Sequence, residues 1–175
     1  MLDEQAATPN PYASLLNDPD PARSVGAMRI MMESGDRELI DIALEHGLLS
    51  ANEAVRTAAF EAYLRTSPRL LVTFDGSDGL SPGMKDIGRR MGGTFTDDGM
   101  IHARWQLGQY DDAKECTLMA DKDECAATVN ANGIFLHGDF NYSFRGAVTV
   151  SEDGNLIGSV LVSNDRYPIR IQLLD

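Results

Sequence analysis

The 175-residue chain has no long apolar run, and no stretch approaches the roughly 18 residues that a membrane-spanning helix needs. Basic residues are also scarce: 15 Lys and Arg stand against 27 Asp and Glu, which gives a formal net charge of −12. No basic stripe is visible that would neutralise phosphates. We therefore expect the protein to bind neither nucleic acid nor an anionic membrane surface.

Cysteine is nearly absent, and the chain contains only Cys116 and Cys125. Two thiolates are too few for a four-thiolate zinc site, and no His lies at the close spacing that zinc modules use. A predicted hairpin of residues 115–120 and 124–131 would allow the two sulfur atoms to face each other. A disulfide there would indicate a periplasmic or secreted protein, whereas two free thiols would leave a cytoplasmic location open.

The chain also lacks the common catalytic signatures. It has no Gly-x-Ser-x-Gly nucleophile elbow and no Gly-Lys-Ser/Thr phosphate loop, so we assign no catalytic residue and expect no cofactor. His102 and His137 lie close in sequence to Asp97, Asp98 and Asp139. A His–Asp pair can act as a general base, so a hydrolase that uses His102 or His137 with a nearby Asp stays open as an alternative.

Two acidic segments resemble metal sites, but only in part. Residues 75–79 read Asp-Gly-Ser-Asp-Gly, the start of a calcium loop, yet Asp86 stands where that loop needs a bidentate Glu. The run 121–124, with Asp111 and Asp112 upstream, is typical of solvated loop tips. We therefore expect no metal site.

The first part of the chain combines helix-capping residues with apolar residues at helical spacing. One helix is predicted over residues 21–33 with Asp20 as its N-cap. A second follows Asp36 and runs to about His46, with Gly47 in the left-handed position that ends it. These patterns predict helices with one packed face each.

A third helix begins with a capping box of Ser50 and Glu53 and ends before Pro68. From Arg69 onward the apolar residues recur with a period of two, which indicates strands. Strands are predicted at residues 70–75, 100–107, 115–120, 124–131, 140–150, 156–163 and 169–173, with one short helix at 82–91. The chain thus divides into a flexible leader (1–17), a helical domain (18–68) and a β-rich domain (69–175).

Two tetrapeptides in the helical domain echo each other 33 residues apart: Asp20-Pro21-Ala22-Arg23 and Glu53-Ala54-Val55-Arg56. This pattern resembles HEAT-like helical repeats over about residues 18–67. In that family the acidic residue and the arginine tie successive repeats together, and the stacked helices form protein-binding surfaces. The resemblance implies that Asp20, Arg23, Glu53 and Arg56 are structural anchors.

The expected fold class is α+β, with a short HEAT-like helical layer followed by an antiparallel β-sandwich or partly open barrel. Our leading hypothesis is a non-enzymatic module that binds a partner protein or self-associates. Its predicted contact surface is the turn around Asp111 and Asp112, and the neighbouring Tyr110 is a candidate for ligand contact. The alternatives are the hydrolase and a carbohydrate- or ligand-binding β-domain of an exported protein.

Overall fold

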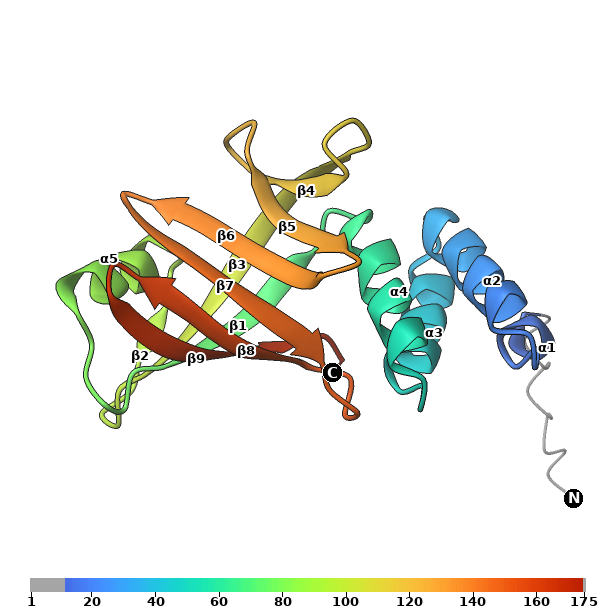
Figure 1. The fold of residues 1–175 in the computed structure, drawn as a ribbon, viewed down its shortest axis with the longest axis horizontal. Helices are drawn as coiled ribbons and strands as arrows, with labels where there is room; N and C mark the ends of the chain where they lie inside the picture. Colours follow the sequence, from blue (N-terminus) through green and yellow to red (C-terminus); the bar gives the residue numbers. More distant parts are fainter. Residues whose placement is uncertain (1–11, 175) are drawn as a thin grey trace, which may run out of the picture.

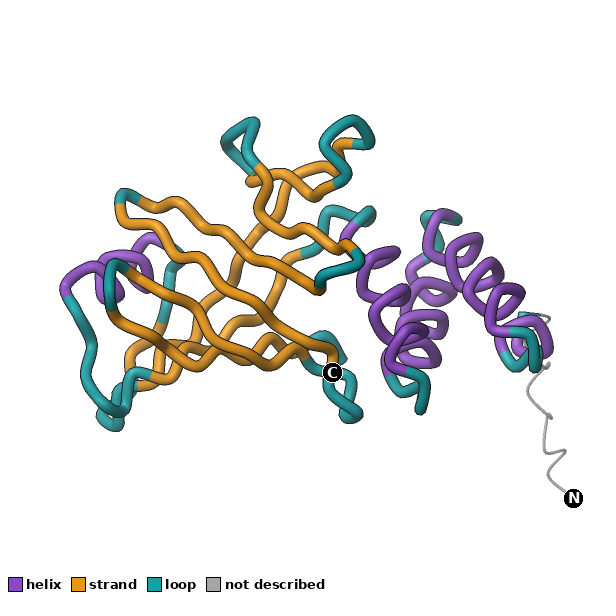
Figure 2. The backbone as a smooth tube through the Cα atoms, viewed as in Figure 1, coloured by secondary structure: helices purple, strands orange, loops and turns teal. Residues whose placement is uncertain are grey.

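A computed structural model describes residues 12–174, in which a layer of helices lies at one end of a β-barrel (Figure 1). The helices are α1 (Ala13–Leu16), α2 (Pro21–Glu33), α3 (Arg37–Leu48), α4 (Glu53–Leu64) and α5 (Pro82–Arg90). The strands are β1 (Arg69–Asp75), β2 (Thr94–Phe95), β3 (Met100–Asp111), β4 (Cys116–Met119), β5 (Cys125–Asn130), β6 (Gly133–Phe140), β7 (Tyr142–Val150), β8 (Leu156–Val162) and β9 (Asp165–Gln172). Figure 2 shows that α5 is inserted within the strand region, between β1 and β2.

The barrel is closed. Its strands follow the order β1-β9-β8-β7-β6-β5-β4-β3, every neighbouring pair is antiparallel, and β1 also pairs with β3 along seven residue pairs from Arg69↔Gln106 to Asp75↔Met100. The short β2 lies outside this ring, on the edge of β3. The predicted sandwich or partly open barrel is therefore wrong, because the β1–β3 pairing leaves no open edge. The sequence could not show this closure, since a two-residue period does not reveal which strands pair.

Side chains with a period of two fill the barrel interior. Phe74 of β1, Trp105 of β3 and Phe144 of β7 pack edge to face, with ring centroids 5.7 Å apart for Phe74–Phe144 and 5.2 Å for Trp105–Phe144. The fully buried Met84 and Ile87 of α5 add to this core at the end away from the helical layer (Figure 1). The interior is a packed core rather than a channel.

Helix α4 joins the helical layer to the barrel, and it packs against β5 and β7. At its first turn, the buried Arg56 side chain donates from Nε to the Val150 carbonyl oxygen of β7 at 3.2 Å. At its end, the Thr117 hydroxyl of β4 donates to the Leu64 carbonyl oxygen at 3.2 Å. The buried apolar residues of the layer and the barrel consequently form one core.

Two features of the helical layer differ from the sequence predictions. Gly47 lies within α3 instead of ending it, and a Cβ there would lie 2.3 Å from Met28 Sδ and 2.5 Å from Ala59 Cβ. Its lack of a side chain thus allows close helix packing, a non-local role that looks like a C-cap in the sequence. The N-cap of α4 is Asn52, whose side chain accepts from Ala54 N at 2.9 Å, and not Ser50.

The strand predicted over residues 140–150 is in fact the end of β6 and all of β7. The turn lies at Asn141, which has a φ of 78°, and Tyr142 is exposed instead of joining the apolar face. The sequence analysis also missed β6 before Phe140, although Ile134 and Leu136 alternate there and are buried.

Of the predicted leader (residues 1–17), residues 1–11 lie outside the described residues. Over the remainder, α1 packs on α2: Leu16 is buried, and its carbonyl oxygen accepts from the Ser24 hydroxyl at 2.6 Å. A four-residue helix is too short to be stable in isolation, so its formation depends on this tertiary contact. It is also too short to show a clear period in the sequence.

Candidate functional site

The outer wall of the barrel is unusual in its charge. Strand register places the outward side chains of β7, β8, β9, β1 and residues 100–106 of β3 on one continuous surface. Five of the chain's 15 basic residues point outward there: Arg145, Arg166, Arg170, Arg69 and Arg104. Asp75, at the end of β1, is the acidic residue among these positions. In a chain of net charge −12, the wall is therefore a local region of positive charge.

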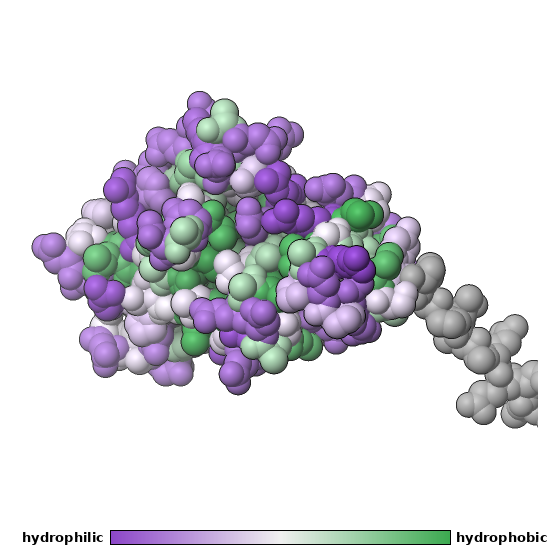
Figure 3. Space-filling model, turned by 45° about the vertical axis from the view of Figure 1, so that its right-hand side comes forward, coloured by the Kyte–Doolittle hydropathy of each residue, from purple (hydrophilic) through white to green (hydrophobic). Residues whose placement is uncertain are grey.

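Apolar side chains lie among these arginines. Phe135 is 40% exposed, and Ile157 and Leu161 are each 41% exposed. Cross-strand pairing links Phe135 to Ala147, Ala147 to Ser159, and Ser159 to Pro168, with Ile157 and Leu161 on either side of Ser159 along β8. We call this group the wall patch (Phe135, Ala147, Ile157, Leu161, Pro168). Figure 3 shows apolar surface over the barrel, interspersed with polar surface, on the face in view.

A groove of about 570 Å³ lies on β1 and β3, and we call it the β1–β3 groove. Its charged and polar lining includes Arg69, Thr73, His102, Arg104 and Gln172. The Thr73 hydroxyl lies 3.0 Å from His102 Nδ1. The groove combines cationic side chains with polar hydrogen-bonding groups, which is a chemistry suited to an anion.

A second groove, of about 530 Å³, lies on β5, β6 and β7 beside the wall patch. It is lined by Phe135, His137 and Arg145, among other residues. Burial lowers the pKa of His137 below its usual 6.5, and the Arg145 guanidinium lowers it further. His137 is therefore mostly neutral at pH 7, so it adds little charge to this groove.

The two histidines proposed for catalysis do not form one site. His102 lies on β3 and lines the β1–β3 groove, whereas His137 lies on β6 and lines the other groove. Asp139 is held by Lys122, with Nζ 2.5 Å from Oδ2, and this ion pair lowers the pKa of Asp139. Asp98 accepts a hydrogen bond from the Thr96 hydroxyl in the β2–β3 turn. The side chain that contacts His102 is thus a threonine and not an aspartate.

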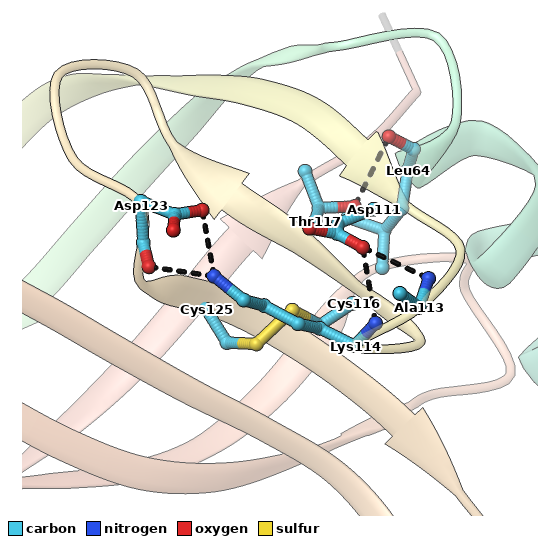
Figure 4. Close-up of a disulfide and its surroundings, with 8 residues drawn as sticks. All are labelled: Leu64, Asp111, Ala113, Lys114, Cys116, Thr117, Asp123 and Cys125. Atoms are coloured by element: carbon cyan, nitrogen blue, oxygen red, sulfur yellow. Dashed lines mark hydrogen bonds and ion pairs between the residues drawn. A yellow bond between two sulfur atoms is a disulfide. The ribbon is translucent and has the colours of Figure 1, made fainter.

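The turn proposed as a contact surface packs toward the helical layer. The Arg65 guanidinium at the end of α4 lies 3.9 Å from the centroid of the Tyr110 ring and 3.2 Å from Asp112 Oδ1. Burial raises the pKa of Tyr110. Asp111 Oδ1 accepts from the backbone N–H groups of Ala113 and Lys114 (Figure 4). Tyr110 and Asp112 therefore bridge the two parts of the fold.

Cys116 and Cys125 form a disulfide between β4 and β5 (Figure 4). Beside it, Lys114 Nζ lies 2.6 Å from Asp123 Oδ1 and 2.9 Å from the Asp123 carbonyl oxygen, which links the segment before β4 to the loop between β4 and β5. Of the two alternatives considered for the cysteines, the structure has the disulfide, and neither sulfur is a free nucleophile.

The acidic loop that resembles a calcium site is closed by its own hydrogen bonds. Asp75 Oδ1 accepts from the Ser77 hydroxyl at 2.6 Å and from its backbone N–H at 2.9 Å, and these bonds lower the pKa of Asp75. Within residues 12–174, no three His, Cys, Asp or Glu side chains cluster as metal ligands.

The four predicted repeat anchors occupy different environments. Arg56 is buried, and its Nη1 donates to the carbonyl oxygens of Ser50 at 2.8 Å and Ala51 at 3.2 Å. Arg23 is on the surface, where its side chain is 75% exposed and 3.8 Å from Asp20. Asp20 accepts from Ala22 N as the N-cap of α2. Glu53 begins α4 as its first residue.

The sequence analysis missed Arg69, Arg104 and Arg145 as site residues. The available signal was the position of these arginines at outward strand positions without an acidic neighbour two residues away. Only strand order shows that they share a surface.

Comparison of the chain with protein-family models, curated proteins and solved structures finds no match. Across residues 12–174, no helix has the length and apolar character required to span a membrane. The functional argument therefore depends on the chemistry of the barrel wall.

Proposed function

We propose that this protein is a non-enzymatic binding module that docks another protein on its wall patch. The observation that supports this most is the exposure of Phe135, Ile157 and Leu161 on one continuous surface. Apolar side chains that gather on a surface, with arginines around them, are typical of protein interfaces.

The charge around the patch indicates the kind of partner. Arg145 pairs across strands with Leu161, and Leu161 pairs with Arg166. The outward positions of β7 and β8 hold no acidic residue. A partner surface that combines apolar side chains with carboxylates would complement this arrangement, because opposite charges at the rim favour encounter and orientation.

The test is to compare partner capture by the wild-type chain and by the Leu161→Glu variant. A matched control is Ile30→Glu, because Ile30 is 64% exposed on α2, far from the wall. Proteins crosslinked to the wild type in its source cells and quantified by mass spectrometry should be lost with Leu161→Glu and retained with Ile30→Glu. Retention of every partner by Leu161→Glu would contradict docking on the patch.

A second copy of the chain is the other occupant that this experiment must distinguish. Sedimentation velocity of the purified protein separates the two cases. A dimer that Leu161→Glu dissociates would identify self-association as the role of the patch, whereas a monomer leaves the patch to a different protein.

We also propose that the protein works in an oxidising compartment, either the periplasm or outside the cell, because Cys116 and Cys125 are joined. The bond closes a sequence separation of 9 residues, for which the loop-entropy model gives a stabilisation of about 2–3 kcal/mol. The Cys116→Ala/Cys125→Ala variant should lose this stability in urea unfolding, and reductant should not lower it further. Two reactive thiols in protein denatured straight from its source would count against the proposal.

A second candidate function is binding of a small ligand, and the β1–β3 groove favours it. A volume of about 570 Å³ is within the range of small-molecule sites, and its lining combines charged, polar and apolar side chains. A titration of the full chain with small ligands, followed by NMR, tests this candidate.

A further inference from the structure

The β1–β3 groove has a defined arrangement of side chains around Leu71. Strand register sets Arg104 of β3 opposite Leu71 on one side and Gln172 of β9 opposite it on the other. Arg69 and Thr73 flank Leu71 along β1 and point to the same outer face, because they lie two residues away in each direction. Leu71 is 39% exposed, so the groove has an apolar floor edged by two guanidinium groups.

These two arginines have no acidic partner among the described residues. Elsewhere on the surface, Arg65 pairs with Asp112, Arg90 with Asp86, and Arg170 with Asp153. Arg69 lies opposite Gln106, so Arg69 and Arg104 are diagonal neighbours, with their Cα atoms about 7–8 Å apart. The two side chains carry like charges on neighbouring positions, and an anion bound between their guanidinium groups would relieve the repulsion.

His102 adds a further hydrogen-bonding group. Its Nδ1 lies 3.0 Å from the Thr73 hydroxyl, which is paired with it across β1 and β3. When Nδ1 accepts the hydroxyl proton, the neutral imidazole carries its own proton on Nε2. In that arrangement, Nε2 can donate a hydrogen bond to a ligand.

We propose that the β1–β3 groove binds a small phosphate monoester. Each guanidinium can donate two parallel hydrogen bonds to phosphate oxygens, a geometry that a dianion with several oxygens satisfies better than a single carboxylate does. Leu71 and the mostly buried Met91 line the same groove and provide contact for the apolar body of the ester. This inference rests on the ligand-binding candidate and is independent of docking on the wall patch.

The test titrates the full chain with phenyl phosphate, inorganic phosphate and maltose, monitored by backbone amide shifts in NMR. Phenyl phosphate should bind more tightly than inorganic phosphate and shift the amides of residues 69–73 and 102–104. Arg69→Ala and Arg104→Ala should each weaken binding by about 10-fold or more, since each variant removes charge-assisted hydrogen bonds to the phosphate. Arg37→Ala, which removes an exposed cation at the start of α3, is the matched control and should change nothing.

Several results would overturn the inference. Equal weakening by Arg37→Ala would show that the anions respond only to overall charge. Binding of maltose without either phosphate would keep the ligand-binding candidate and reject the anion. Absence of binding by all three probes would reject both. Leu71→Ser should remove the preference for phenyl phosphate while leaving inorganic phosphate unchanged, and a retained preference would exclude the apolar floor. Thermal melts of each variant establish that the barrel remains folded.

Discussion

Arg56 should be one of the most important single side chains for stability, because it connects the helical layer to the barrel. Its side chain is buried, with the residue 7% exposed, and it donates to three carbonyl oxygens, those of Val150, Ser50 and Ala51. Truncation by Arg56→Ala leaves these acceptors without their donor. Each buried acceptor left without a donor costs about 1–3 kcal/mol. Water can reach the part-buried carbonyl oxygens of Ser50 and Ala51 and partly replace the lost donor. We therefore expect a net loss of about 3 kcal/mol in the free energy of unfolding.

The control for this prediction is Arg23→Ala. Arg23 holds the equivalent position in the first tetrapeptide, but its side chain is 75% exposed, and its distances to Asp18 and Asp20 are 3.9 Å and 3.8 Å. Exposed ion pairs contribute about 0–1 kcal/mol, so this variant should unfold nearly as the wild type does.

Urea unfolding should be followed by circular dichroism, which reports mainly the helices, and by fluorescence of the barrel residue Trp105. The wild type should give coincident transitions, because the layer and the barrel share one core. In Arg56→Ala the helical signal should be lost at lower urea than the fluorescence signal. A loss below about 1 kcal/mol, equal to that of Arg23→Ala, would refute the anchoring role.

Two further predictions concern packing and titration. Gly47→Ala should destabilise the fold, because its Cβ would overlap Met28 and Ala59, and the cost of this overlap should exceed the roughly 1 kcal/mol gained from the better helix propensity of Ala. In Gly26→Ala the new Cβ meets nothing within 4 Å, so this variant should stabilise α2 by up to about 1 kcal/mol. Thermal melts compare the two variants. Burial and the Arg145 guanidinium lower the pKa of His137 in the folded state below 6.5, so its effect on stability should be absent above pH 6.5, and stability should fall as the pH drops from 6.5 through the folded pKa. Arg145→Ala should raise the pKa of His137 measured by NMR. An unchanged pKa would contradict the contribution assigned to Arg145.

The local elements of the fold were largely predictable from the sequence. The N-cap at Asp20 and the bounds of α2 agree with the prediction, because capping depends on residues adjacent in the chain. Strands β1, β8 and β9 follow their two-residue alternation, since one face of each lies in the core. The disulfide was one of two alternatives, because the hairpin geometry allowed it without requiring it.

The closure of the barrel and the location of the candidate site were decided by the tertiary structure. Pairing of β1 with β3 depends on residues that are far apart in the chain, and alternation alone does not specify a partner. The same pairing brings Arg69 beside Arg104, so the β1–β3 groove exists only once the barrel has closed. Amino-acid composition sets the net charge at −12, whereas the register of the strands gathers the arginines on one wall.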